Sequence, residues 1–112
     1  MGDIEFGQRL KPGHVVVITP EAVGVAAGQL LVAAGDQPRR IAIHFQNTSL
    51  ATIYIGIDAT VLAANGRALA PASGVNLGDG GAWTVDVGAG QAFWAIATGA
   101  GSALIVVELI GV

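Results

Sequence analysis

The sequence predicts an all-β protein, a jelly-roll-like β-sandwich of about eight short strands. Short runs rich in Val, Ile and aromatic residues alternate apolar and polar side chains, which is the period of a half-buried strand. Clusters of Gly, Pro, Asn and Asp separate these runs at intervals of roughly 8–12 residues, as in sandwiches and barrels. The length of 112 residues suits one domain with its own core.

The first 13 residues differ from the rest of the chain. Residues 1–13 are polar and end in the turn signal Lys11-Pro12-Gly13, so we expect an N-terminal arm or a loose edge segment there. Residues 14–112 are expected to form the single sandwich domain. Its expected strands, in chain order, cover residues 14–19, 29–33, 39–47, 53–58, 82–87, 92–98 and 103–110.

Breaker residues set the limits of these strands. Pro20 should end the first strand, and Gly35-Asp36 should end the second. Between the later strands, turn signals stand at Asn65-Gly66, Pro71 to Gly74, Gly78 to Gly81, Gly88 to Gly90 and Gly99 to Gly101. Two stretches of helix-like composition, residues 21–27 and 60–64, are too short for more than a turn or two.

The third expected strand has the clearest alternation. Ile41, Ile43 and Phe45 should share one face, with Arg40 and His44 on the other. The next strand repeats the pattern, and its three isoleucines should share one face. The strand over 92–98 alternates in the same way. The isoleucines of the strand over 53–58 are Ile53, Ile55 and Ile57. In the strand over 92–98, Phe93, Ala95 and Ala97 alternate with Trp94, Ile96 and Thr98.

Charge is scarce in this chain. Only 12% of the residues are charged, against about 25% in ordinary soluble domains, and the mean hydropathy is +0.65. The longest apolar run, 104–112, is interrupted by Glu108 and is shorter than the ~20 residues of a membrane-spanning helix. The last strand is apolar on both faces, which suits a central strand or one that meets another subunit. We therefore expect part of the surface to be buried in a homodimer or homotrimer, or against another protein.

Several classes of function are disfavoured. Five Lys and Arg residues and a net charge of −3 argue against a nucleic-acid partner, which requires clustered basic groups. The absence of Cys excludes disulfides, thiolate metal sites and a cysteine nucleophile. The first residues are acidic and lack the apolar core of a signal peptide, so we expect a protein made in the cytoplasm without a secretion signal and without a membrane partner.

No catalytic signature is evident, and we expect no enzyme activity, cofactor or metal. His14 and His44 do not form the His-x-His pair that a cupin-type metal site needs. No spacing selects a pair of carboxylates for glycoside hydrolysis, and no G-x-S-x-G elbow or phosphate-binding glycine loop is present. The sequon Asn47-Thr48-Ser49 is interpreted as a polar strand end.

The aromatic residues allow two interpretations. Trp83 and Phe93 belong to alternating strands and are expected in the core, because large aromatic residues dominate burial. Aromatic residues on an exposed strand can instead stack against sugars. Trp94, which points away from Phe93, is the best single candidate for an interface or ligand contact, and Tyr54 is a second.

The only basic doublet, Arg39-Arg40, opens the third expected strand. If both residues lie in the strand, one points to each face. The simple interpretation is a solvated strand start. The alternative is an ionic contact to an acidic partner, because Arg pairs with carboxylates through two hydrogen bonds.

One stretch of the chain resembles a known group of proteins. Its segments are a strand ending in Gln46-Asn47-Thr48-Ser49, then Ile53-Tyr54-Ile55-Gly56-Ile57-Asp58, then Asn65-Gly66 and Leu69-Ala70-Pro71. This order resembles small β-sandwich virion proteins of tailed bacteriophages, including capsid decoration (cement) proteins and some tail or fibre proteins. With the later strands, the resemblance covers about two-thirds of the chain. It departs at Ala72-Ser73, where a Gly and an acidic residue are more usual.

The resemblance implies a non-enzymatic structural protein of the virion. Such a protein stabilises the head by binding across shell subunits, so its partners would be the major capsid protein or another virion protein. N-terminal arms of these proteins can lie across neighbours, which makes Ile4, Phe6 and Arg9 candidate anchors. One alternative is a tail, fibre or other glycan-binding module that uses Trp94 or Tyr54. A cupin-like enzyme is the other, and metal analysis would test it.

Overall fold

The computed structural model describes residues 15–30, 40–73, 80–86 and 91–110, all of them in strands or in the connections between strands. The strands are β1 (Val15–Val23), β2 (Gly28–Gln29), β3 (Arg40–Asn47), β4 (Ile53–Gly56), β5 (Arg67–Leu69), β6 (Ala82–Val85), β7 (Trp94–Ala97) and β8 (Ser102–Ile110). They form two four-stranded antiparallel sheets, which confirms the predicted all-β sandwich. The expected arm, residues 1–13, lies outside the described residues.

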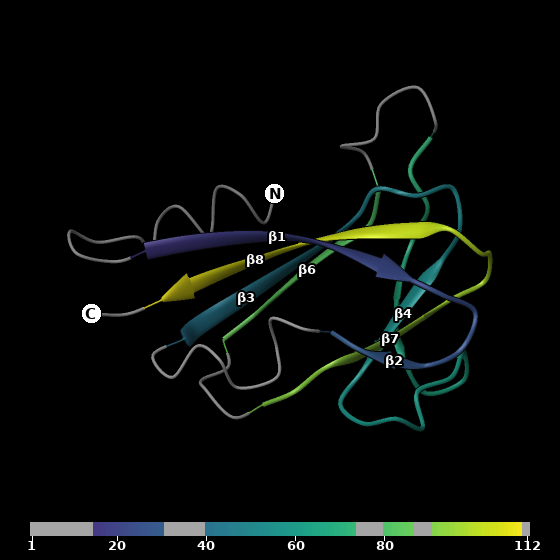
Figure 1. Ribbon diagram of the computed structural model, residues 1–112, viewed down its shortest axis with the longest axis horizontal. Coiled ribbons are helices and arrows are strands. Elements are labelled where there is room, and N and C mark those ends of the chain that lie inside the picture. The colour runs from purple at the N-terminus through teal and green to yellow at the C-terminus, as the bar shows by residue number, and fades with distance from the viewer. Residues whose placement is uncertain (1–14, 31–39, 74–79, 87–90, 111–112) are drawn as a thin grey trace.

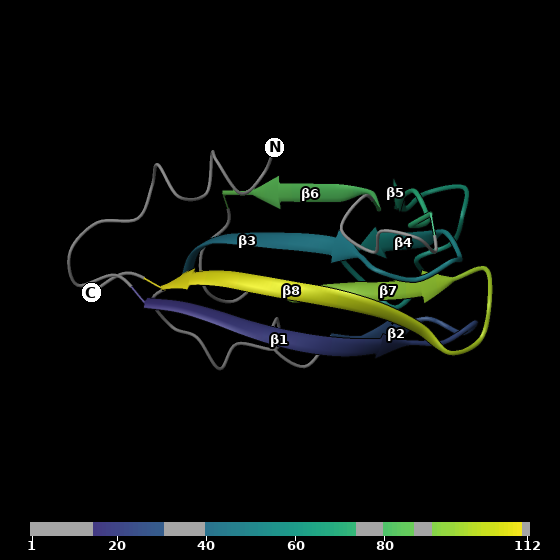
Figure 2. The same ribbon diagram turned by 90° about the horizontal axis from the view of Figure 1, so that it is seen from above.

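The two sheets are stacked as layers. Sheet A has the strand order β1-β8-β3-β6, and sheet B has the order β2-β7-β4-β5. Figure 1 shows sheet A above sheet B, and Figure 2 looks down onto sheet A. In both views sheet A extends beyond sheet B at the end where β1 begins and β8 ends.

The core lies between the sheets and is built mainly from alternate residues of the strands. Phe45 is at its centre, with its ring stacked on Trp83 at 5.9 Å and edge-on to Phe93 at 5.1 Å between ring centroids. Phe93 is buried, and Trp83 is partly buried against the cluster. Other buried members of the cluster are Val23, Leu30, Ile43, Ile53, Ile55, Leu69, Ala95, Ala97, Leu104 and Val106.

The last strand is central in its sheet, which is one of the two placements that its apolar composition predicts. β8 lies between β1 and β3 in sheet A. Leu104 and Val106 face the core, whereas Leu109 packs with Ala42 and Val107 in a separate cluster on the outer face of the sheet. A strand with apolar contacts on both faces is typical of a sheet interior.

Pro20 does not end the first strand, contrary to the prediction. β1 continues through Pro20 to Val23 and pairs in unbroken register with β8. β1 is an edge strand, and a proline is tolerated there when its nitrogen faces away from the neighbouring strand. Of the expected second strand, only Gln29 is in β2, and residues 31–33 lie outside the described part of the chain.

A bulge at the start of β3 overturns the predicted faces of two residues. Arg40 pairs with Ile110 and Ala42 pairs with Leu109, so one residue of β3 has no partner across the ladder. That residue, Ile41, is 43% exposed instead of sharing the core face, and Arg40 turns inward. Beyond the bulge the predicted alternation holds.

The fourth strand is shorter than predicted. β4 ends at Gly56, and Ile57 is 65% exposed rather than facing the core with Ile53 and Ile55. A Cβ on Gly56 would lie 2.6 Å from the side chain of Val61, so the loop after β4 packs directly on the glycine backbone. The three-residue β5 follows this loop and was not predicted, because three residues are too few for a period to show.

Candidate functional site

The outer face of sheet A carries an apolar strip on β1 and β8. The outward-facing residues are Val16, Ile18, Pro20 and Ala22 on β1, and Ala103, Ile105, Val107 and Leu109 on β8. Val16 is 40% exposed and Ile18 is 64% exposed. These eight positions, called the apolar strip below, hold no charged side chain. Figure 2 views the sheet from this side.

Polar groups border the strip on the neighbouring strands. His44 of β3 is buried, and its Nδ1 lies 2.6 Å from the hydroxyl of Thr84 on β6. Gln46 donates through Nε2 to the carbonyl oxygen of Gly80 at 2.6 Å. The outer face of sheet A therefore changes from apolar at β1 and β8 to mixed at β3 and β6, where His44, Gln46 and Thr84 lie among alanines.

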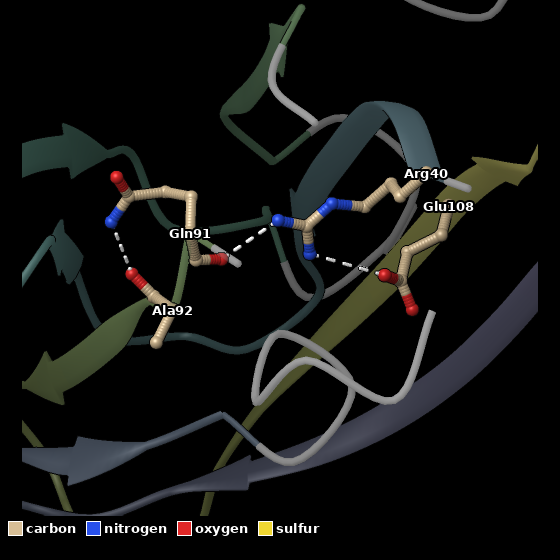
Figure 3. Close-up of polar contacts among 4 residues, drawn as sticks. All are labelled: Arg40, Gln91, Ala92 and Glu108. Carbon is tan, nitrogen blue, oxygen red and sulfur yellow. Dashed lines mark hydrogen bonds and ion pairs between the residues drawn. The ribbon is translucent and has the colours of Figure 1, made fainter. Parts of the chain in front are cut away.

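Arg40 lies inside the protein rather than on its surface. It is 3% exposed, and its Nη1 donates to Oε2 of Glu108 at 3.1 Å. Its Nη2 donates to the carbonyl oxygen of Gln91 at 2.7 Å, and its guanidinium carbon lies 5.7 Å from the ring centroid of Phe93. Figure 3 shows the two hydrogen bonds of Arg40, to Glu108 and to Gln91, and the side chain of Gln91 donating to the carbonyl oxygen of Ala92. The Arg40 charge therefore acts within the chain, and Arg39 lies outside the described residues.

The partner of Arg40 was not anticipated from the sequence. Glu108 is 0% exposed on the central strand β8, where it faces the space between the sheets. A single acidic residue inside an apolar central strand was the available signal, because a buried carboxylate requires a partner. The ion pair joins β3, β8 and the chain segment before β7, and we assign it a structural role.

Asn47 is also structural. Its side chain is 0% exposed, and its Nδ2 donates to the carbonyl oxygens of Ala51, Leu69 and Ala70 at 2.8, 3.0 and 3.1 Å. Its Oδ1 accepts from the backbone N–H and the hydroxyl of Ser49 at 2.9 and 2.8 Å. The amide therefore ties the end of β3 in sheet A to the end of β5 in sheet B, and it is inaccessible to a modifying enzyme.

Tyr54 and Trp94 lie on the same outer face of sheet B. Tyr54 pairs with Ile96, and Trp94 pairs with Gly56, so the two aromatic residues are diagonal neighbours on adjacent strands, with separations of about 7–8 Å expected for such positions. Both are half-buried. A Cβ on Gly66 would lie 2.7 Å from the Cβ of Tyr54, so the loop after β4 covers one side of this tyrosine.

Two hollows lie outside these faces. One of about 200 Å³ is lined by Gly56, Ile57, Asp58, Thr60, Val61 and Asn65. There, hydrogen bonds from the Thr60 hydroxyl and then from its backbone N–H lower the pKa of Asp58. The other, about 490 Å³, is lined by residues 48–51 and 99–103, none of them charged. Among the described residues, no three His, Asp or Glu side chains gather as metal ligands would.

No family model matches the chain, and no curated protein is significantly similar to it. The described residues include no helix that is long and apolar enough to cross a membrane. The candidate anchors Ile4, Phe6 and Arg9 lie outside the described part of the chain.

Proposed function

We propose that this protein is a non-enzymatic structural protein of a tailed-phage particle that decorates the capsid and stabilises it by binding across shell subunits. The observation that carries the proposal is the uncharged apolar strip on the outer face of sheet A. Five of its eight positions are exposed, namely Val16, Ile18, Pro20, Ala22 and Ala103, whereas Leu109 is buried. Exposed apolar surface without charge is typical of a protein–protein contact. The low fraction of charged residues in the whole chain supports the same proposal.

The strand pairing supports the finer description of the sandwich as jelly-roll-like. β1 pairs with β8, β2 with β7, β3 with β6 and β4 with β5. This is the nested pairing of one long hairpin rolled into two sheets. Jelly rolls occur in viral capsid proteins, lectins and cupins, so the fold is compatible with a virion role by analogy alone.

Decoration would work through many weak contacts. A shell presents the same seam many times, and repeated attachment raises the effective affinity without stronger single contacts. In this proposal the apolar strip covers shell subunits on either side of a seam. The N-terminal arm adds a second contact through Ile4, Phe6 and Arg9, so deletion of residues 1–13 should weaken binding to shells, and unchanged binding would rule out the arm's role.

Co-sedimentation with capsid shells of the phage that carries the gene tests the proposal. The test variant combines Ala22→Asp with Ala103→Asp, two exposed positions on the apolar strip. The control is Ala68→Asp, at an exposed position on β5 whose cross-strand partner is Tyr54, on the outer face of sheet B. We expect the test variant to bind at least tenfold more weakly and the control to bind normally. Absence of wild-type binding, or full binding by the test variant, would contradict the proposal.

A second candidate, a tail or fibre module that binds host glycans, is favoured by one observation. Tyr54 and Trp94 lie together on the outer face of sheet B, where two aromatic rings could stack against sugar rings. A glycan array tests it. Binding that is lost in Trp94→Ala would support this function, whereas no binding, or binding unaffected by the substitution, would exclude it.

A further inference from the structure

β1 is a long sheet edge that no described strand covers. It has nine residues, whereas the edge strands β2, β5 and β6 have two, three and four. Short edges resist unwanted pairing by themselves, and long edges are normally protected by Lys, by bulges or by an inward-pointing charge. β1 has Pro20 and the inward-facing Glu21 in its second half, but residues 15–19 contain no charge, Pro or Gly and pair with β8 without a bulge.

The backbone groups that β1 presents outward can be assigned from the ladder. Thr48 donates its N–H to the carbonyl oxygen of Ala103, so the odd-numbered residues of β8 point their backbone groups toward β3. The even-numbered residues of β8 therefore bond to β1, through their odd-numbered partners there. Val16 and Ile18 consequently direct N–H and C=O groups away from the sheet. Pro20 points its nitrogen the same way, which explains why the strand tolerates it.

We infer that two copies of this chain pair antiparallel through residues 15–19 of β1, about a two-fold axis at Val17. Val16 of each copy then lies opposite Ile18 of the other. Because both residues present an N–H and a C=O at the open edge, this register forms four backbone hydrogen bonds and meets no proline. The exposed side chains of Val16 and Ile18 become cross-strand β-branched neighbours on the outer face.

Charge and symmetry favour a second copy as the occupant. Each copy carries a net charge of −3, yet the pairing segment contains no charged residue. The acidic side chains beside it are Glu108, opposite Val17 on β8, and Glu21 on β1, which are 0% and 8% exposed and face inward. An antiparallel strand edge is complementary to itself under a two-fold axis. The pairing joins the two copies of sheet A into one eight-stranded sheet.

The proposed contact between the two copies is small. Five residues of strand span about 17 Å, so the contact falls below the ~1,200 Å² of a standard interface and the dimer should be weak and concentration-dependent. The pairing deepens the proposed assembly role, because a dimer presents two apolar strips side by side. It can nevertheless be tested on purified protein, so its failure is distinguishable from a failure to bind shells.

Cysteine cross-linking tests the register directly, because the chain has no Cys of its own. At the two-fold axis, Val17 faces Val17 of the second copy as a non-hydrogen-bonded pair, with Cα atoms about 4.5 Å apart, which a disulfide can span. We expect Val17→Cys to form a disulfide dimer under mild oxidation. The control Ala22→Cys places the two thiols about 33 Å apart in the same pairing and should remain monomeric. No dimer from Val17→Cys, or equal cross-linking of both variants, would overturn the inference.

Sedimentation of cysteine-free protein over a range of concentrations gives an independent test. Ile18→Lys should weaken self-association at least tenfold, because it places like charges beside the two-fold axis. Ile57→Lys, at a position of nearly equal exposure on the loop after β4, is the matched control and should leave it unchanged. A monomeric wild-type protein at all concentrations, or equal effects of the two substitutions, would contradict the pairing.

Discussion

Replacing Asn47 with Ala should cause one of the largest losses of stability available to a single substitution in this protein. The substitution removes five hydrogen bonds, of which the one to the Leu69 carbonyl is fully buried. A buried group left unsatisfied costs about 1–3 kcal/mol, and a hydrogen bond that water can replace contributes about 0.5–1.5 kcal/mol. Allowing water to reach the partly exposed groups at Ala51, Ala70 and Ser49, we expect a loss of about 3–5 kcal/mol in the free energy of unfolding.

Urea unfolding followed by tryptophan fluorescence measures this loss, and thermal unfolding should show a Tm lower by about 12–20 °C for a chain of this length. Asn65→Ala is the matched control, because Asn65 is exposed and also bonds to backbone groups, accepting from Leu62 and donating to Thr60. We expect the control to lose about 1 kcal/mol. A loss below about 1 kcal/mol for Asn47→Ala would refute the view that this amide ties the two sheets together.

Three further predictions concern other parts of the sandwich. Glu108→Gln should destabilise the protein by about 3–5 kcal/mol in urea unfolding, because it removes the carboxylate charge from a buried ion pair. Glu108→Leu combined with Arg40→Met should recover most of that loss, and no recovery would contradict the prediction. Gly80→Ala should prevent folding at 37 °C, because the new Cβ would lie 1.9 Å from the backbone carbonyl oxygen of Asn47. Circular dichroism measures this, and a native spectrum for the variant would contradict the close packing of Gly80 against Asn47. Thr60→Val should raise the pKa of Asp58 in an NMR titration, because the hydroxyl bond holds that pKa low. A carboxyl group with a lowered pKa adds stability at neutral pH. The difference in stability between wild type and Thr60→Val should therefore vanish as the pH falls through the pKa of Asp58. An unchanged pKa of Asp58 in the variant would exclude the Thr60 hydroxyl as the cause.

The strand alternation in the sequence was sufficient to predict the sandwich and much of its core. Phe45 and Leu104 were placed correctly in strands, because each belongs to a run with a clear period. Phe93 is buried as predicted, but it lies just before β7 rather than in the strand. The errors arise where a local backbone feature overrides the period. The bulge after Arg40 exposes Ile41, and no composition signal marks a bulge between two ordinary residues.

The site depends on contacts between distant parts of the chain, which a single sequence does not reveal. The Arg40–Glu108 pair joins residues 68 positions apart, and only the pairing of β3 with β8 brings them together. The placement of Tyr54 and Trp94 on one face likewise depends on β4 lying next to β7. The apolar strip was anticipated as a shortage of charge and as a last strand that is apolar on both faces. Its β1 half was not anticipated, because its location depends on which strand lies beside β8 in sheet A.

The most direct test of the account is to locate the protein on an intact particle by cryo-electron microscopy. We expect copies of the protein at the seams between shell subunits, with the outer face of sheet A and its apolar strip against the shell. Copies that contact the shell through the outer face of sheet B, where Tyr54 and Trp94 lie, or particles that lack the protein altogether, would contradict it.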